Sequence, residues 1–302
     1  MYQQGDRIMK RARTATWLLC CGMTALVFGQ KDAAPPETFR LSYAEGEWTS
    51  LSLRQDVFYQ RDIKMAATAN AAAREIKESQ KIGFEVVLRS LSKNADGSRE
   101  IEVVFRNKWR ESRRDGGPAA VTDYSPAVGK RMAFRLGPDG QISGVKGFES
   151  FPEIIDPASG RPIPNVDFAH DILYVLPQLP TAPVSIGSTW EAPWPRLPDE
   201  TGDPVPHRFQ ILGRTKKAGE DCLIIVSTYD ENSSRERLSP NGEPIGIEDA
   251  TRGIEVFYFS PTKNMLIAKC HSWQGDMKAR TAGQVAREVK TLAMYECSVT
   301  FD

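Results

Sequence analysis

The sequence from residue 172 to residue 190 reads ILYVLPQLPTAPVSIGSTW and separates two stretches of similar character. Its apolar start is ended by Pro177, because proline lacks the backbone N–H that a helix or strand needs. Further prolines keep the chain extended until Gly187 and Trp190, where a new strand is expected. We interpret residues 167–183 as a short helix followed by a proline-rich connector, with one half of the protein on each side.

The first half, residues 39–166, is predicted to form antiparallel hairpins. Apolar and polar side chains alternate before a turn at Asn94–Gly97 and again after it, in Glu100–Arg110, and this period of two is typical of strands with one buried face. Another hairpin turns at Gly137–Gly140, where the Pro-Asp-Gly sequence supplies the backbone geometry that tight turns need.

The second half, residues 184–302, shows the same succession of hairpins. Turn sequences lie around Lys217–Gly219 and at Ser260–Asn264, and a last strand is expected over Val289–Phe301. The predicted fold class is therefore mainly β. We expect two similar, curved antiparallel sheets built from hairpins, in a half-barrel or sandwich-like arrangement, joined by the short helix and the proline-rich connector.

Residues 63–81 remain ambiguous at this point. The segment IKMAATANAAAREIKESQK is rich in alanine and other good helix formers, and its apolar residues recur at helical spacing. However, the apolar stripe is mostly alanine and buries little surface, and the neighbouring segments all read as strands. Tertiary context can override such a propensity, so helix and strand both stay open.

The first 29 residues predict a secretory signal peptide. Basic residues end at Arg13, an apolar run follows over Ala15–Phe28, and small residues precede a cleavage point before Gln30. This run is too short to span a hydrocarbon core of about 30 Å. We therefore expect an exported protein, periplasmic or extracellular, whose residues 30–38 form a flexible leader.

Two other interpretations of this N-terminus stay open. In one, the apolar run is retained as an anchor instead of being cleaved; in the other, Cys20 or Cys21 carries a lipid. No other segment has the length of a membrane span, so the mature chain is not expected to cross a membrane. Removing the four basic residues and one acidic residue of the first 29 leaves 35 basic against 38 acidic residues, which argues against nucleic acid as a partner.

Nothing in the sequence indicates a catalytic centre, a metal site or a cofactor. Histidine occurs only three times, and no zinc-protease, nucleophile-elbow or phosphate-loop motif is present. Cys270 and His271 are adjacent in a predicted strand, so their side chains point to opposite faces and cannot act as nucleophile and base. The acidic residues around the connector are interpreted as solvated loop residues.

Two groups of side chains are candidates for other roles. The cationic residues Arg106, Lys108 and Arg110, with Arg113 and Arg114 in the following loop, are predicted to form an exposed row that could contact an anionic surface. The alternative is an edge strand whose charges discourage pairing. Among the cysteines, Cys270 and Cys297 are the pair expected to form a disulfide, if one forms, because their strands are predicted hairpin partners.

Four segments resemble, in this order, a family of exported bacterial proteins of unknown function: LSYAEGEWTS, AVGKRMAFRLGPDGQISGVKGFESF, LPQLPTAPVSIGSTWE and GIEVFYFSPTKNMLIA. The joint of the LPxxPVxxGxxW type belongs to this pattern. The resemblance implies an exported, β-rich domain pair without known catalytic residues, and it favours strand over helix for residues 63–81. The curved hairpins are also similar, at the level of the fold, to half-barrel proteins that carry lipid or lipoprotein through the periplasm.

Three functions remain compatible with these observations. The first is a non-enzymatic binding or envelope-associated module for lipid or another apolar ligand. The second is a structural module that contacts another envelope protein and has no small-molecule site. The third is a hydrolase with an unrecognised site, which the scarcity of histidine disfavours. The sequence leaves the ligand, the partner and the oligomeric state open.

Overall fold

A computed structural model describes residues 37–67, 72–157, 160–173, 175–193, 205–238, 244–281 and 284–301. The chain divides into two units, Met1–Glu37 and Thr38–Asp302, and all elements below belong to the second. The predicted signal peptide, with Cys20 and Cys21, lies outside the described residues. Within the described part of the chain, no helix is long and apolar enough to span a membrane.

The described elements are almost all strands, as the sequence predicts. They are β1 (Ser50–Met65), β2 (Arg74–Lys93), β3 (Arg99–Arg114), β4 (Ala120–Thr122), β5 (Arg131–Leu136), β6 (Ile142–Lys146), β7 (Ile154–Asp156), β8 (Arg161–Ile163), the helix α2 (Val166–Leu173), β9 (Thr189–Pro193), β10 (Pro206–Lys217), β11 (Glu220–Leu238), β12 (Pro244–Ser260), β13 (Met265–Thr281) and β14 (Gln284–Phe301), with 3-10 turns at Ser125–Ala127 and Phe148–Ser150.

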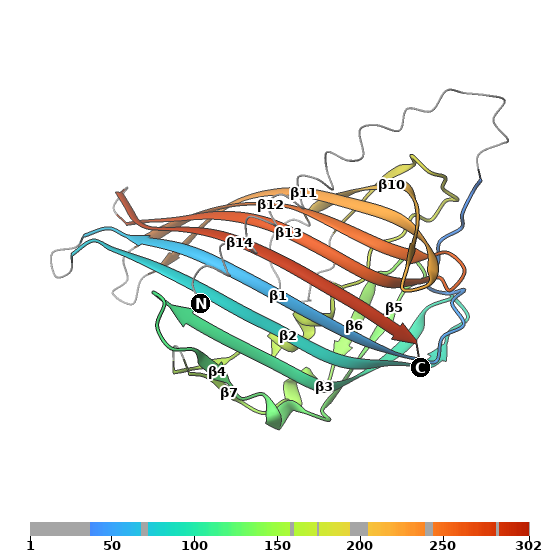
Figure 1. The fold of residues 1–302 in the computed structure, drawn as a ribbon, viewed down its shortest axis with the longest axis horizontal. Coiled ribbons are helices and arrows are strands. Elements are labelled where there is room, and N and C mark those ends of the chain that lie inside the picture. Colours follow the sequence, from blue (N-terminus) through green and yellow to red (C-terminus); the bar gives the residue numbers. More distant parts are fainter. Residues whose placement is uncertain are drawn as a thin grey trace. The chain divides into compact units, whose positions relative to one another are not determined.

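The strands form one large antiparallel sheet and one small one (Figure 1). The large sheet has twelve strands in the order β6-β5-β3-β2-β1-β14-β13-β12-β11-β10-β9, with β4 paired beside β3, and β7 pairs with β8 separately. The mainly-β, antiparallel class built from hairpins is therefore confirmed. The two expected sheets are joined, however, because β1 pairs with β14 along almost its whole length, from Leu51 opposite Phe301 to Met65 opposite Arg287.

The two halves also run through the sheet in opposite orders. The first half starts at the centre with β1 and moves outward to β6, whereas the second starts at the far edge with β9 and returns to the centre with β14. The succession of hairpins is repeated, as the turns indicated, but the direction in which strands are added to the sheet is not. Turn sequences identify which strands are neighbours, and they carry no information about the edge to which the next hairpin is added.

The ambiguous segment is strand in its described parts. β1 runs to Met65 and β2 begins at Arg74, and residues 68–71 lie outside the described residues. Lys64 pairs with Glu75, and Ile63 with Ile76, so pairing with the neighbouring strand prevails over the helix propensity of the alanines. The expected short helix is present as α2.

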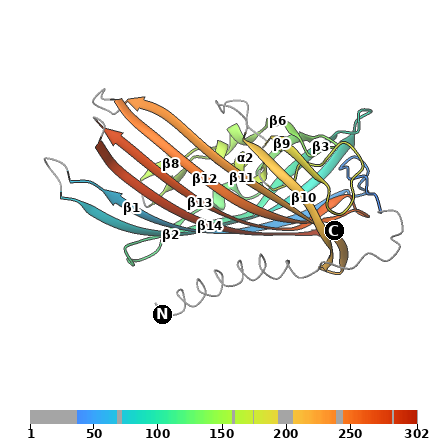
Figure 2. The same cartoon turned by 90° about the horizontal axis from the view of Figure 1, so that it is seen from above.

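The main core lies on one face of the large sheet, which we call the inner face. Phe168 of α2 packs edge-on against Phe105 of β3, with ring centroids 5.3 Å apart, and the core continues into Phe209 of β10 and Phe257 of β12. Both halves of the chain contribute to it. The small sheet, α2 and the connector cover this part of the inner face (Figure 2).

The long strands continue beyond this covered part (Figure 2). In β1 the inward side chains change from fully buried at Leu51 and Leu53 to half-buried at Tyr59 and Arg61. A small separate cluster of Ile63, Ile76 and Val289, with Met277 against it, lies farther along. We call the inner face from Tyr59 towards the β1 end at Met65, across β2 and β11–β14, the open region.

Candidate ligand-binding face

At the border between the covered core and the open region, the inner face carries rows of side chains from residues that are paired across neighbouring strands. One row holds Lys269 between Cys297 and Phe257. The next places His271 between Tyr295 and Glu255, and a third places Trp273 between Ala293 and Gly253. Because side chains of residues directly opposite one another share a face, these rows bring charged and aromatic groups together. The cluster consists of Tyr59, Tyr229, Glu255, Lys269, His271, Trp273 and Tyr295, and we call it the inner-face cluster.

A buried ion pair is the base of this cluster. The Lys269 Nζ atom lies 2.6 Å from Oε1 of Glu255, and both side chains are buried, Glu255 completely. Lys269 also lies over the ring of Phe257, at 4.9 Å from its centroid. Taking two charges out of water costs several kcal/mol for each ion, and their attraction often only compensates for that cost. The pair is thus poorly explained by stability alone.

His207 and Ser227 flank the carboxylate but do not form a hydrolase triad with it. Nδ1 of His207 lies 3.3 Å from Oε2 of Glu255 and 3.1 Å from Oγ of Ser227. A triad needs the serine on one ring nitrogen and the acid on the other, so that the ring can accept one proton while the acid holds the second. Here both partners share one nitrogen, and all three side chains are buried.

His271 links the ion pair to the tyrosines. Its Nδ1 atom lies 3.9 Å from Oε1 of Glu255, and its Nε2 atom is hydrogen-bonded to the hydroxyl of Tyr229 at 3.0 Å. On the other side, its ring stacks on Tyr295 with centroids 4.7 Å apart. The hydroxyl of Tyr295 is within 2.8 Å of the Tyr59 hydroxyl and accepts a hydrogen bond from Nε1 of Trp273 at 3.1 Å. The cluster is therefore one continuous polar and aromatic network.

Three aromatic side chains of the cluster alternate with small residues in one cross-strand row. Along one row, Tyr59, Trp273 and Tyr229 alternate with Ala293 and Gly253. A Cβ atom on Gly253 would come within 2.4 Å of the Tyr229 ring, so that ring lies directly on the glycine backbone. Tyr59, Tyr229 and Trp273 are half-buried. The row is thus an aromatic floor that exposes part of each ring.

Burial and charge hold the ionisable groups of the cluster in defined states. Burial alone would raise the pKa of Glu255, but the charge of Lys269 and then the hydrogen bond and charges of the histidines lower it to about 2. Burial lowers the pKa of His271 to about 3, against the attraction of Glu255. Burial, followed by the charge of Glu255, raises the pKa of Tyr229. At neutral pH the network therefore holds an ionised Glu255, a neutral His271 and a neutral Tyr229.

No metal centre accompanies this network. Among the residues that the structure describes, no group of three or more histidine, cysteine, aspartate or glutamate side chains has the arrangement of a metal site. What the cluster offers chemically is an aromatic surface with hydrogen-bonding groups at its edge.

The predicted cationic row does not exist as one surface. Val86 pairs with Phe105 but Glu85 pairs with Asn107, so Arg106 is an extra residue that reverses the alternation beyond it. As a result Lys108 turns inward, where its Nζ atom lies 4.3 Å from the centre of the Phe168 ring.

The other members of the row are divided between two faces. Arg110, also inward, is 3.9 Å from Asp156, and Arg114 pairs opposite Glu78 on the same face. Arg106 is exposed, and Arg113 is exposed and donates a hydrogen bond to Glu111. The prediction of a single row was wrong because the strand pattern was read without the bulge.

The expected disulfide is absent. The strands of Cys270 and Cys297 are hairpin partners, as predicted, but Lys269 is the residue opposite Cys297 and Glu296 the residue opposite Cys270. The two thiols therefore point to opposite faces of the sheet, and both are free, as is Cys222. Burial raises the pKa of Cys297 to about 12, so this thiol is not reactive at neutral pH.

Sequence reasoning missed Glu255, Lys269 and most of the cluster. The signal was present in the alternation of β12, where Glu255 shares its face with Phe257 and Phe259. Lys269 lies opposite Phe257, but Ile267 is an extra residue between Leu266 and Ala268, so the alternation of β13 gives no such signal. A charge at a core position of a strand is unusual and indicates a buried partner. His271 was assessed only against its neighbour Cys270, although its partners come from β11, β12 and β14.

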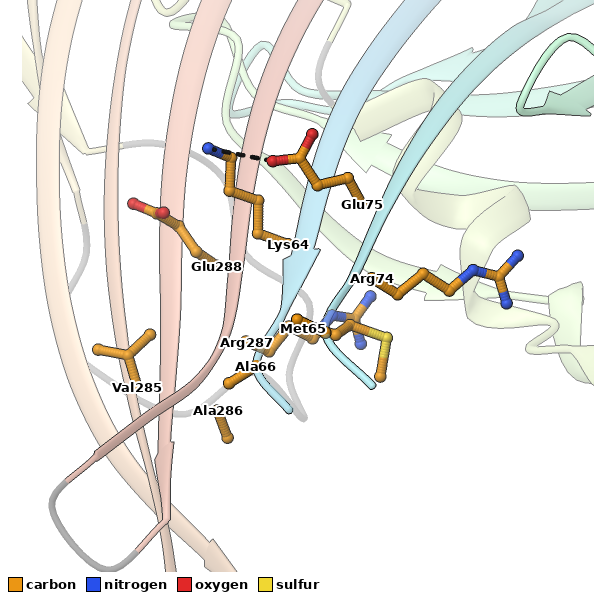
Figure 3. Close-up of a pocket in the computed structure, with 10 residues that line it drawn as sticks. Lys64, Met65, Ala66, Arg74, Glu75, Val285, Ala286, Arg287 and Glu288 are labelled. Carbon is orange, nitrogen blue, oxygen red and sulfur yellow. Dashed lines mark ion pairs between the residues drawn. The ribbon is translucent and has the colours of Figure 1, made fainter. Parts of the chain in front are cut away.

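A pocket lies where the open region ends, around neighbouring strand ends, and its lining includes side chains from both faces of the sheet (Figure 3). Its volume is about 330 Å³. Lys64 and Glu75 form an ion pair of 3.5 Å across its rim, and Met65 and Val285 are exposed there. The lining residues are Lys64, Met65, Ala66, Ala73, Arg74, Glu75, Val285, Ala286, Arg287 and Glu288.

Comparison with known proteins finds distant likenesses among solved structures. No protein-family model and no curated protein matches the chain, so no family model supports the resemblance of the four segments. A solved structure described as "Lipid-protein interactions in lipovitellin" aligns with 85% of this chain at 8% identity and a TM-score of 0.47, and the chain spans 25% of that protein. The botulinum neurotoxin serotype C1 binding domain aligns over 85% of this chain and 84% of that one, at 8% identity and a TM-score of 0.13.

Proposed function

We propose that this protein is an exported, non-enzymatic binding module that holds an amphipathic, lipid-like ligand on the open region of its inner face. The observation that carries the proposal is the aromatic floor of Tyr59, Trp273 and Tyr229. Large rings that remain partly exposed at the end of a covered core provide apolar surface for a ligand.

The surroundings of the floor fit a ligand with both apolar and polar parts. Beyond the rings lies the aliphatic cluster of Ile63, Ile76 and Val289, with Met277 half-buried beside it. At the other side, the hydroxyls of Tyr59 and Tyr295 and the buried Glu255 supply polar character. An amphiphile placed with its chain towards Met65 would lie on the rings and reach this aliphatic cluster past the ion pair of Arg61 and Glu78, whose charged atoms are 3.6 Å apart.

The geometry of the buried polar groups supports a role in binding without catalysis. The arrangement of Ser227, His207 and Glu255 around one ring nitrogen does not allow the proton transfers of acyl hydrolysis. These three side chains are also buried, so a ligand on the rings would not contact them.

Short-range quenching by brominated lipids tests the proposed site. A fatty acid with bromine on its chain should quench Trp273 in the purified mature protein, because the chain would lie on that ring. The variant Trp273→Phe should lose this quenching. The matched control is Trp109→Phe, since Trp109 lies on the opposite face, where Arg54 packs on its ring at 5.0 Å.

The outcome that contradicts the proposal is equally clear. If the wild-type protein shows no quenching, or if quenching survives in Trp273→Phe and disappears in Trp109→Phe, the open region is not the binding face. Native mass spectrometry of untreated and delipidated samples adds a second readout. Identical mass spectra, with no lipid released, would favour the structural, ligand-free alternative.

Export is part of the same proposal and has its own test. The N-terminal pattern of basic residues, apolar run and small residues supports cleavage before Gln30. Mass measurement of the protein recovered from a bacterial periplasmic fraction should give a chain that starts at Gln30. Recovery of an uncleaved chain in the membrane fraction would instead show a retained anchor.

A further inference from the structure

We propose that the inner-face cluster recognises a cationic head group, an amine or quaternary ammonium, on the amphiphile that the open region binds. This inference rests on the proposed function and specifies its ligand class. Three features carry it: the arrangement of the aromatic rings, the orientation of the buried ion pair, and the absence of a competing positive charge on His271.

The rings meet at steep angles, as in sites that surround a cation. The Tyr59 ring stands at 72° to Trp273 and at 76° to Tyr295, with centroids 6.3 and 5.9 Å away. The electron-rich faces of such rings attract ammonium groups, and recognition of quaternary ammonium by several rings is the best-known use of this interaction. Tyr59, Tyr295 and Trp273 are half-buried, so part of each ring remains accessible.

The structure itself places a cation on one of these rings. The guanidinium carbon of Arg61 lies 5.6 Å from the centre of the Tyr59 ring, and the same side chain lies 3.6 Å from Glu78. The presence of Arg61 shows that the electrostatics at Tyr59 accept a positive charge. Glu78 compensates that charge, so Arg61 does not make the site positive as a whole.

The buried ion pair presents its negative end to the cluster. Lys269 stands in the row of Phe257 and Cys297, on the side of the covered core, whereas Glu255 stands in the next row, with His271, towards the open region. The pair is neutral as a unit but is oriented, with the carboxylate nearer to the rings. Coulomb attraction falls with distance, so the nearer charge prevails at the floor.

The ionisation of the neighbouring groups agrees with this orientation. Burial has the largest influence on the pKa of His271, and among its charged neighbours Glu255 acts more strongly than Lys269 or His207. Glu255 is also the first charged neighbour to act on the pKa of Tyr229, where it opposes ionisation. At neutral pH His271 carries no charge that would repel a cation. Glu255 is then the charge that decides the preference.

A series of amphiphiles with one chain and different heads tests the proposal. Dodecyltrimethylammonium, dodecanoate and monododecanoylglycerol are titrated, below their micellar concentrations, into the mature protein at neutral pH, with Trp273 fluorescence as the readout. We expect the ammonium compound to bind about tenfold more tightly than the carboxylate, the size of effect that one cation–aromatic and charge interaction provides. The uncharged glyceride should fall between them.

Two variants assign the preference to the cluster. In the double variant Glu255→Gln with Lys269→Met, which leaves no unpaired buried charge, the three heads should bind with similar affinity. Tyr59→Leu should lower the affinity for all three amphiphiles, because Tyr59 belongs to the aromatic floor, but it should lower ammonium affinity several-fold more than glyceride affinity, since only the cation needs the ring face. Lys81→Met, a substitution on the opposite face of β2, should leave the order of affinities as in the wild type.

The outcomes separate this inference from the function on which it rests. If all three amphiphiles bind with equal affinity, or the carboxylate binds best, the cationic preference is overturned while a lipid-like ligand stands. If none binds, the proposed function fails as well. Preference for ammonium that persists in the double variant would show that the charge of Glu255 does not set the preference, and would overturn the assignment.

Discussion

Glu255 and Lys269 depend on each other because neither has access to water. Replacing one of them leaves a charge in the core without its partner. We expect Glu255→Gln alone, or Lys269→Met alone, to lower the free energy of unfolding by about 3–5 kcal/mol. The double variant should come within about 1 kcal/mol of the wild type, because removing both charges also removes the desolvation cost. Urea denaturation of the four proteins measures this coupling, and additive losses would contradict it.

The same network predicts loss of stability in acid. The pKa of His271 is about 3 in the folded protein against 6.5 for a free histidine. Between these values the unfolded chain binds a proton that the folded chain does not, so stability falls as the pH is lowered. The pKa of Glu255, about 2 against 4.5, acts in the same direction at lower pH, because protonation removes its pairing with Lys269.

Replacing His271 should therefore flatten the pH profile in one window. Each group contributes a slope of about 1.4 kcal/mol per pH unit while it titrates only in the unfolded state. For His271→Gln, the free energy of unfolding should lose this slope between about pH 6 and about pH 4, whereas the slope at still lower pH, which Glu255 contributes, should remain. Parallel profiles for the two proteins would show that His271 is protonated in the folded state.

At the scale of elements, the bulge in β3 decides which face its side chains occupy. The register shift at Arg106 turns Trp109 to the outer face, opposite Gly83. A Cβ atom on Gly83 would lie within 2.3 Å of two atoms of the Trp109 ring and 2.7 Å from the backbone oxygen of Gln55. The position of Trp109 therefore depends both on the extra residue Arg106 in β3 and on a glycine, which has no side chain, at position 83 of β2.

A glycine comparison tests that dependence. Gly83→Ala should lower the free energy of unfolding by about 1–3 kcal/mol, the cost of forcing an extra group into a packed site. The matched control is Gly246→Ala in β12, where a Cβ atom would meet nothing within 4 Å, and it should change stability little. Adding Trp109→Ala to Gly83→Ala should recover part of the loss. No recovery would mean that the contact with Gln55 alone is responsible.

The strand pattern of the sequence predicts the positions of the turns but not the face of the sheet to which each side chain points. The hairpin turns at Asn94–Gly97, Gly137–Gly140 and Ser260–Asn264 could be predicted because each needs particular residues. The faces of the sheet to which Lys108 and Trp109 point could not be predicted, since one unpaired residue, Arg106, reverses the alternation of side chains beyond it. For the same reason Cys270 and Cys297, correctly placed on partner strands, point to opposite faces.

The candidate site was less predictable than the fold, for a reason of scale. Tyr59, Tyr229, His271 and Tyr295 come from four strands and meet only through cross-strand register. Register between strands distant in sequence depends on the whole sheet and leaves no local pattern. Glu255 was the accessible signal, because a charge on the same face of the strand as the core residues Phe257 and Phe259 already implies a buried partner.

At the scale of the molecule, the two halves share one sheet and one core. β1 and β14 are paired along their length, and the main core draws on residues from Phe39 to Val299. A chain divided between β9 and β10 should therefore give two fragments that are unstructured alone. Mixed together, they should recover the β-sheet circular dichroism of the intact protein. Independent folding of either fragment would show that the halves are separate domains.

The pairing of β1 with β14 also has a consequence for the order of events during synthesis. The strand that is made first acquires its second neighbour only when the last strand has left the ribosome, so the centre of the sheet forms after its flanks. Contacts of such long sequence separation form slowly. The complete sheet therefore cannot form until all of β14 has been synthesised, even though the hairpins on either side of its centre can pair earlier.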